Sequence, residues 1–242
     1  MSSSKEVKPV VPENDSRLNV NDIAYPSEKG SVRAYFARPK GNGKLPGVVV
    51  IHENRGLVPH IKDVARRVAL EGFLTVAPDA LSPVGGTPVD VTDVPALIQK
   101  LDREATIKNL VAAAKYLKTY PQSTGKVGVM GFCWGGGMTN QVAVNSPDVK
   151  AAVPFYGMPP VAEDVPKIRA SMLLHYAGND QWINQGVPAY EAALKKAHID
   201  YELHMYPGAE HAFFNDTGPR YNPEAAKQAW ERTISFFKQK LA

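Results

Sequence analysis

The sequence predicts an α/β protein, an open and mostly parallel central sheet with helices on both faces in three layers. Short apolar runs of strand length alternate along the chain with longer segments whose apolar residues recur at helical spacing. The run at 46–51 is rich in β-branched residues, which is typical of a strand buried on both faces. No internal repeat or low-complexity block interrupts this alternation, so it favours parallel strands joined by helical crossovers.

The individual elements follow from these two periodicities. Strands are expected at 32–37, 46–51, 74–77, 127–130, 151–155, 172–176 and 201–206. Helices are expected at 60–71, 106–120, 138–144, 189–197 and 223–240. Residues 80–98 are rich in proline and glycine without a clear period, and are expected to form a long surface loop that could act as a lid.

The length of 242 residues fits one large domain. Residues 1–16 are polar and proline-rich and are expected to form a flexible N-terminal arm, which leaves 17–242 as the domain. The formal net charge is +4, and the basic residues are never denser than pairs, so no nucleic-acid partner is expected. No apolar run reaches the roughly 20 residues of a membrane span.

The start of the chain lacks the apolar stretch of a secretory signal. A cytoplasmic location is therefore expected, or a periplasmic one if a signal has been removed. The single cysteine, Cys133, excludes an intramolecular disulfide and a cysteine-rich metal site.

The most informative segment surrounds this cysteine. Gly131, Cys133 and Gly135 form a G-x-C-x-G pattern between an expected strand and an expected helix. This is the nucleophile-elbow pattern with Cys in the Ser position, in which small residues on either side let strand and helix pack closely. The N-terminus of the following helix is expected to favour the thiolate and to stabilise a nearby oxyanion. The alternative is a buried structural cysteine.

A thiol nucleophile needs a base, and the base needs a carboxylate that orients it. His211 lies in a loop just beyond the expected strand at 201–206, and Asp180 follows the strand at 172–176. The order Cys133, Asp180, His211 is the order of nucleophile, acid and histidine in α/β-hydrolases. Taken singly, Asp180 could be a turn or N-cap residue and His211 a solvated loop residue.

Other polar residues give weaker signals. His52 ends the strand at 46–51, and a structural role is favoured over one in the site. The pair His52-Glu53 begins like an H-E-x-x-H zinc motif, but position 56 is Gly. No glycine-rich loop opens a helix in the manner of a dinucleotide site. Neither a metal nor any other cofactor is predicted.

With these residues in view, the chain from about residue 32 to its C-terminus resembles the dienelactone hydrolase family of α/β-hydrolases. The resemblance rests on IHENRGL at 51–57, APD at 77–79, GFCWGG at 131–136, FYG at 155–157, GND at 178–180 and GAEHAF at 208–213. It implies an α/β-hydrolase fold and a triad of Cys133, Asp180 and His211.

The resemblance also implies roles for neighbouring residues. Glu53 would hold the resting thiol and help to deprotonate it when substrate arrives, whereas the alternative is a salt bridge to a neighbour such as Arg55. The backbone N–H groups of Asn54 and Trp134 would form the oxyanion hole, in agreement with the elbow geometry.

The sequence departs from the family where the substrate is bound. Dienelactone hydrolases carry two arginines for the substrate carboxylate, and the corresponding positions here are Pro83 and Asn215. Arg55 or another basic residue could compensate. Apolar residues near the motifs suggest a more apolar pocket. The candidate pocket residues are Leu81, Trp134, Tyr156, Phe213, Phe214 and Asn215.

These observations predict a carboxylic-ester or lactone hydrolase that works through a thioester acyl-enzyme, on a small-molecule substrate. One alternative is a non-catalytic or redox-sensing thiol module on a hydrolase scaffold, and another is a peptidase of the same fold. The sequence leaves open the acyl group and whether the protein is a monomer or a homodimer.

Overall fold

The computed structural model describes residues 8–28 and 30–242. Its sheet has eight strands: β1 (Leu18–Ser27), β2 (Gly30–Pro39), β3 (Leu45–Ile51), β4 (Leu74–Pro78), β5 (Ser123–Phe132), β6 (Val149–Phe155), β7 (Ser171–Ala177) and β8 (Tyr201–Tyr206). They lie in the order β1-β2-β4-β3-β5-β6-β7-β8. The pairs from β4 through β8 are parallel, whereas β2 is antiparallel to both β1 and β4. The predicted mostly parallel sheet is confirmed.

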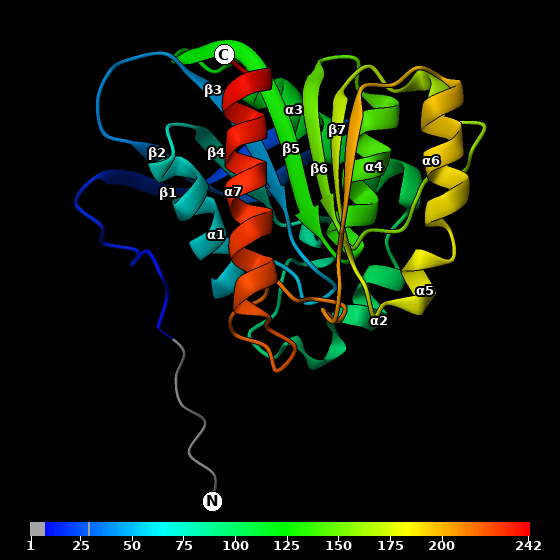
Figure 1. Cartoon of the computed structure of the whole chain (residues 1–242). Helices are drawn as coiled ribbons and strands as arrows, with labels where there is room; N and C mark the ends of the chain where they lie inside the picture. Colours follow the sequence, from blue (N-terminus) through cyan, green and yellow to red (C-terminus); the bar gives the residue numbers. More distant parts are fainter. Residues whose placement is uncertain (1–7, 29) are drawn as a thin grey trace, which may run out of the picture.

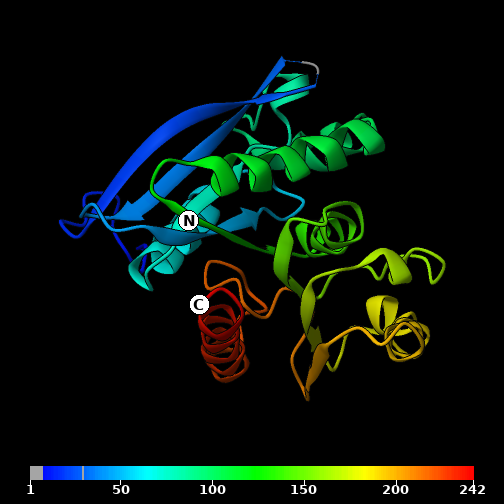
Figure 2. The same ribbon diagram turned by 90° about the horizontal axis from the view of Figure 1, so that it is seen from above.

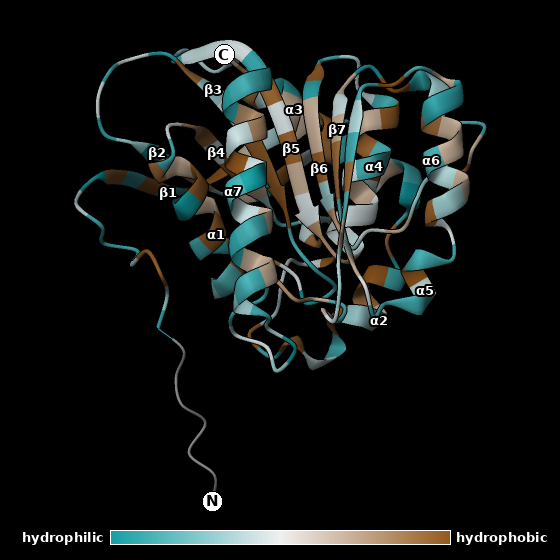
Figure 3. Ribbon diagram, viewed as in Figure 1, coloured by the Kyte–Doolittle hydropathy of each residue, from teal (hydrophilic) through white to brown (hydrophobic). Residues whose placement is uncertain are grey.

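Helices cover both faces of this sheet (Figures 1 and 2). They are α1 (Pro59–Leu70), α2 (Val94–Gln99), α3 (Arg103–Thr119), α4 (Trp134–Asn145), α5 (Gln181–Asn184), α6 (Val187–Lys196) and α7 (Pro223–Lys240). Apolar residues of α1 and α7 join one core cluster, and those of α3, α4 and α6 join a second. The central strands are correspondingly hydrophobic, while the helices turn polar residues outward (Figure 3). The three-layer α/β-hydrolase architecture is thus confirmed.

Three expectations about local structure were wrong. Strand β1 was missed because it is an edge strand in which only Leu18 and Tyr25 are buried, too few to show a period. Residues 80–98 are not a continuous loop, since they contain two 3₁₀ turns and the start of α2, which are too short for a periodic pattern. Helix α4 begins at Trp134 rather than 138, because three weakly helix-forming glycines conceal its first turn.

The N-terminal segment is described from residue 8, so residues 1–7 of the predicted arm lie outside the described residues. Val11 is buried in the core cluster of α1 and α7. The backbone N–H groups of Val10 and Val11 donate to the Asp63 carboxylate on α1, at 3.1 and 2.8 Å. This part of the segment is therefore fastened to α1.

No helix of residues 8–28 and 30–242 combines the length and the apolar character needed to cross a membrane.

The approach of α4 to the sheet is close enough to exclude side chains. A Cβ atom on Gly135 would lie 2.3 Å from the His52 carbonyl oxygen, and one on Gly131 would lie 2.3 Å from the Gly135 carbonyl oxygen. Similarly, a Cβ on Gly136 would lie 2.4 Å from the Phe155 carbonyl oxygen. These obstacles are backbone atoms, so the helix and the strands are held at a fixed distance.

Gly135→Ala is expected to destabilise the fold, because the added methyl group meets backbone that must move. The expected loss is on the order of 1–3 kcal/mol in the free energy of unfolding, measured by urea denaturation. Gly43→Ala is the control, because a Cβ there meets nothing within 4 Å. Equal stabilities of the two variants would contradict the close-packing argument.

Candidate active site

Cys133 occupies the single residue between β5 and α4, in a strained backbone conformation. Its φ is 56° and its ψ is −118°. The strain is held by hydrogen bonds on both sides: its N–H donates to the Phe155 carbonyl and its C=O accepts from the Gly137 N–H, each at 3.1 Å. A non-glycine residue in such a region costs on the order of 1–3 kcal/mol, and such residues gather at functional sites. The local geometry is that of a nucleophile elbow.

The histidine and the acid of the predicted triad are in contact. His211 Nδ1 lies 2.5 Å from Asp180 Oδ2, between the loop that follows β8 and the end of β7. Asp180 is 7% exposed and also caps α5 by accepting from the Ile183 N–H. This pair fixes the tautomer of His211 with the proton on Nδ1, which leaves Nε2 free to accept one.

Glu53 follows β3 directly and is 4% exposed. Its Oε2 accepts a hydrogen bond from Asn215 Nδ2 at 2.7 Å. Asn215 is held in turn, because its Oδ1 accepts from the Thr217 N–H and hydroxyl. The ion pairs of the described residues do not join Glu53 to Arg55, so the alternative role considered for Glu53 has no support. Glu53 Oε1 is buried and has no hydrogen-bond partner among the described residues.

These residues border one cavity of about 340 Å³ at the carboxyl ends of the strands. It is lined by Glu53, Asn54, Arg55, Cys133, His211, Ala212, Asn215, Gly218, Pro219 and Arg220. The structure thus brings Cys133, His211, Glu53, Asn54 and Asn215 together. Asp180 reaches this cavity only through His211. The hydrogen bonds of the described residues do not include one between Cys133 and His211.

The thiol is neutral in this arrangement, and the expectation of a favoured thiolate was wrong. Burial and the negative charge of Glu53 raise the pKa of Cys133 to about 11. Hydrogen bonds from the backbone N–H groups of Trp134 and Asn54, and the charge of Arg220, act in the opposite direction but are outweighed. The predicted oxyanion-hole donors therefore lie beside the resting sulfur.

The expected apolar pocket residues do not line this cavity. Leu81, Tyr156 and Phe214 are buried in the core, and Phe214 stacks on Phe132 with ring centroids 5.0 Å apart. Their apolar character serves packing in this structure, and the apolar substrate pocket stays a prediction. Residues of 80–98 contribute nothing to the lining.

Two exposed arginines border the cavity instead. Arg55 follows β3, and Arg220 lies nine residues after His211 in the same loop. Arg220 was missed from the sequence because no fixed spacing from a motif marks it. The ion pairs found within the described residues leave both guanidinium groups without a carboxylate partner.

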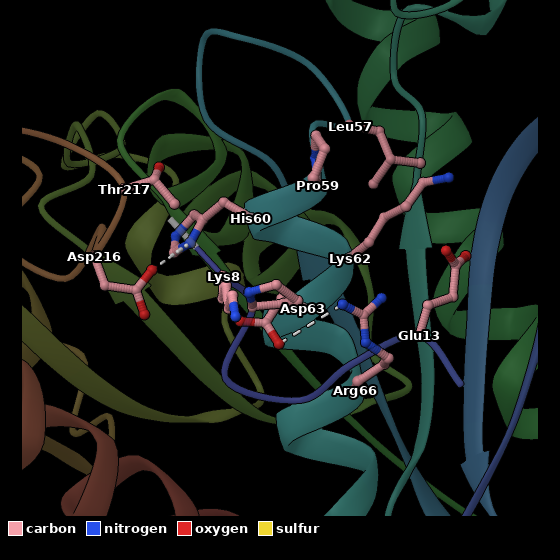
Figure 4. A pocket seen from close by; sticks show the side chains of 11 residues that line it. Lys8, Glu13, Leu57, Pro59, His60, Lys62, Asp63, Arg66, Asp216 and Thr217 are labelled. Atoms are coloured by element: carbon pink, nitrogen blue, oxygen red, sulfur yellow. Dashed lines mark ion pairs between the residues drawn. The ribbon is translucent and has the colours of Figure 1, made fainter. Parts of the chain in front are cut away.

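The loop that carries Asn215 and Arg220 is anchored by charged residues on its other side (Figure 4). Asp216 lies 3.1 Å from His60 Nδ1 and 2.5 Å from the Arg67 guanidinium. Arg67 also pairs with Asp63, which binds the N-terminal segment. Burial alone would raise the pKa of Asp216, but His60 and Arg67 outweigh it and lower this pKa, so Asp216 is charged at neutral pH.

His52 takes the structural role favoured from the sequence. It is fully buried, its Nδ1 lies 2.6 Å from the Glu53 carbonyl oxygen, and its Nε2 accepts from the Ala80 N–H at 3.2 Å. Its ring stacks on Trp134. Burial lowers the pKa of His52, so the ring is neutral and holds the start of the Glu53 loop in place.

Within residues 8–28 and 30–242, no three His, Cys, Asp or Glu side chains gather as they would around a metal ion.

A family model, curated relatives and a solved structure each match most of this chain. The sequence pattern of the "Dienelactone hydrolase family" matches residues 32–241. A "Putative carboxymethylenebutenolidase" of Saccharolobus solfataricus is 37% identical, over 90% of this chain and 98% of the relative. A protein of the same name from Escherichia coli K12 is 34% identical, over 95% and 90%. The crystal structure of a "Putative Dienelactone Hydrolase" from Klebsiella pneumoniae has a TM-score of 0.85 at 30% identity and covers 92% of this chain and 99% of that one.

The neutral thiol makes a direct prediction for the free protein. Because the pKa of Cys133 is raised to about 11, the rate of alkylation by iodoacetamide is expected to increase about tenfold per pH unit from about pH 7 to about pH 10. Cys133 is the only cysteine, so mass spectrometry of the intact protein follows this one site. A rate that levels off near neutral pH would show a thiol that is already ionised.

Proposed function

The chain belongs to the dienelactone hydrolase family, and from this premise we propose that it hydrolyses a carboxylic ester or lactone through a Cys133–His211–Asp180 triad. The observation that carries the proposal is the arrangement at the cavity. A strained cysteine, a histidine hydrogen-bonded to a buried aspartate and a buried glutamate lie around one cavity. These are the groups that nucleophilic acyl transfer needs.

The first step is removal of the thiol proton. Glu53 Oε1 is buried and unpartnered in the described structure, which suits it to accept a proton from Cys133. His211 Nε2 is the second candidate base. Because the resting thiol is neutral, proton removal is part of each turnover, and modest rates on unactivated esters are expected.

The thiolate then attacks the acyl carbon, and the carbonyl oxygen becomes an oxyanion. The N–H groups of Trp134 and Asn54 are the proposed donors to this oxyanion. They lie beside the resting sulfur, so the side chain of Cys133 must leave them when substrate binds. Collapse of the tetrahedral intermediate forms the thioester and expels the alkoxide, which takes a proton from the protonated base.

Water completes the cycle. His211, oriented by Asp180, removes a proton from the water that attacks the thioester carbon. Cleavage of the C–S bond releases the carboxylic acid and a thiolate, and the proton that His211 took from water returns to the sulfur, which restores the Cys133 thiol.

The positive border of the cavity supports a substrate that carries a carboxylate of its own. Arg55 and Arg220 border the cavity, while Asn215 stands where the family has an arginine and is bonded to Glu53. An arginine can bind a carboxylate through two parallel hydrogen bonds. We propose that Arg220, with Arg55, binds the substrate carboxylate in place of the two family arginines that are absent from positions 83 and 215.

Cys133→Ala and His211→Ala are each expected to lower kcat/KM for 4-nitrophenyl acetate and for a small unsaturated lactone by about 10³-fold or more, because each removes a member of the triad. His204→Ala is the matched control, since His204 lies on β8 and does not line the cavity. Full activity of the Cys133→Ala protein would refute the mechanism.

The same assay separates the alternative functions. Cleavage of a 4-nitroanilide at a rate comparable to the ester would favour a peptidase. Reversible oxidation of Cys133 without turnover of any ester would favour a thiol sensor.

Arg220→Gln is expected to lower kcat/KM for a 4-nitrophenyl ester with a free carboxylate by about tenfold relative to 4-nitrophenyl acetate, because it removes a charged partner of that carboxylate. The ratio of the two substrates cancels any effect of Arg220 on the thiol itself. Arg103→Gln, at the exposed first residue of α3 and outside the cavity lining, is the control. An unchanged ratio would exclude Arg220 from substrate recognition.

A further inference from the structure

Tyr156 follows β6 as Cys133 follows β5, and these two strands are neighbours. Four non-glycine residues among those described have positive φ, and Tyr156, at 36°, is one of them. Cys133 and Ala212, at the cavity, are two of the others. The Tyr156 N–H donates to the His175 carbonyl at 2.7 Å, which fixes the strained backbone. Three of the four strained backbone positions therefore lie at the carboxyl ends of the strands, near Cys133.

The Tyr156 ring packs against the loop that carries His211. Its ring centroid lies 5.0 Å from that of His211 and 5.3 Å from that of Phe213. The residue is fully buried, and its hydroxyl has no hydrogen-bond partner among the described residues. Burial, and after it the charges of Glu53 and Cys133, raise the pKa of this hydroxyl well above the ordinary value, and the backbone of Phe214 and the charge of Arg220 act in the opposite direction but are outweighed. Tyr156 therefore keeps its proton, and its O–H can donate a hydrogen bond.

A buried hydroxyl without a partner is unfavourable for folding, because it has lost water and gained nothing in return. Glu53 Oε1 is a buried acceptor without a partner in the same region. One donor and one acceptor without a partner among the described residues are thus close enough for the charge of Glu53 to act on Tyr156. Buried polar atoms are usually paired, so two such atoms at one site call for a functional explanation.

The reaction supplies that explanation. When Cys133 loses its proton to Glu53, the negative charge moves from the carboxylate to the sulfur, and Glu53 becomes neutral. A hydroxyl hydrogen can rotate about the C–O bond to follow this change, whereas a backbone N–H cannot. Hydrogen bonds to a charged acceptor are about twice as strong as those between neutral groups.

We propose that the Tyr156 hydroxyl is a hydrogen-bond donor reserved for the negative charge that appears on Cys133 when the thiol is deprotonated. It acts by stabilising the thiolate and transfers no proton. This inference rests on the proposed function, because it deepens the activation of the same nucleophile.

Tyr156→Phe removes only this hydroxyl and is the test. Iodoacetamide alkylation of Cys133 is expected to be about tenfold slower than in the wild type at each pH between about 7 and about 9, because the thiolate has lost a donor. The value of kcat/KM for 4-nitrophenyl acetate is expected to fall by a similar factor. Stability against urea is expected to stay the same or to increase, because an unsatisfied buried group has been removed.

Tyr176→Phe is the matched control. The Tyr176 hydroxyl is also buried without a partner in the described residues, but Tyr176 packs in the core cluster of α3, α4 and α6, on the other side of the sheet. Burial alone raises its pKa, with no contribution from Glu53 or Cys133. Its variant should keep the wild-type alkylation profile and activity.

An alkylation profile of Tyr156→Phe that coincides with the wild type would overturn the proposal. A loss of stability in Tyr156→Phe that Tyr176→Phe does not share would also overturn it, because the hydroxyl would then serve the fold. Alkylation needs no substrate, so this result stands apart from the proposed activity. Full hydrolysis by Cys133→Ala would refute the proposed function while leaving the alkylation result as a statement about the thiol.

Discussion

The contact between α4 and the ends of β3 and β5 determines the rest of the site. Backbone meets backbone there, since a single methyl group on Gly135 would lie 2.3 Å from the His52 carbonyl oxygen. With helix and strand this close, only one residue can turn the chain, and that residue is Cys133 with φ of 56°. The strain is thus a consequence of the packing, and it places the sulfur at the edge of the sheet where the loops after β3, β7 and β8 meet.

Burial of the sulfur next to a carboxylate makes the thiol hard to ionise, and surrounding residues act against this effect. The two features that keep the thiol neutral, burial and the charge of Glu53, are also those that supply a base and exclude water. Hydrogen-bond donors and a positive charge favour the thiolate instead. They are the backbone N–H groups of Trp134 and Asn54, the Arg220 guanidinium at the rim and, as proposed, the Tyr156 hydroxyl. Under the proposed function, a thiol that is neutral at rest is protected from oxidation and alkylation between turnovers.

The sequence predicted the parts that depend on local rules. The elbow, the order of Cys133, Asp180 and His211, and the parallel sheet each follow from spacing that a folded chain must respect, and the structure joins Asp180 to His211. Quantities that depend on many distant groups were not predictable. The pKa of Cys133 depends on Glu53 and Arg220, which lie in separate loops, and on burial. The position of Cys133 at a helix N-terminus does not tell how large these effects are. No sequence motif marks Arg220. A long side chain can extend to the cavity rim from many positions in a loop, so its position in the sequence is not fixed.

The loop from His211 to Arg220 shows why the site depends on residues far from the chemistry. One side of the loop carries His211, the Asn215 amide that donates to Glu53, and Arg220 at the cavity. Its other side is fixed by Asp216, which pairs with His60 and Arg67 on α1. Because these partners lower the pKa of Asp216, this stabilisation is fully present above the ordinary pKa of an aspartate and is lost as the pH falls through the lowered value. Helix α1 is in turn bound to the N-terminal segment through Asp63, so Val10 and Val11 belong to the support of the active-site loop although they lie outside the cavity.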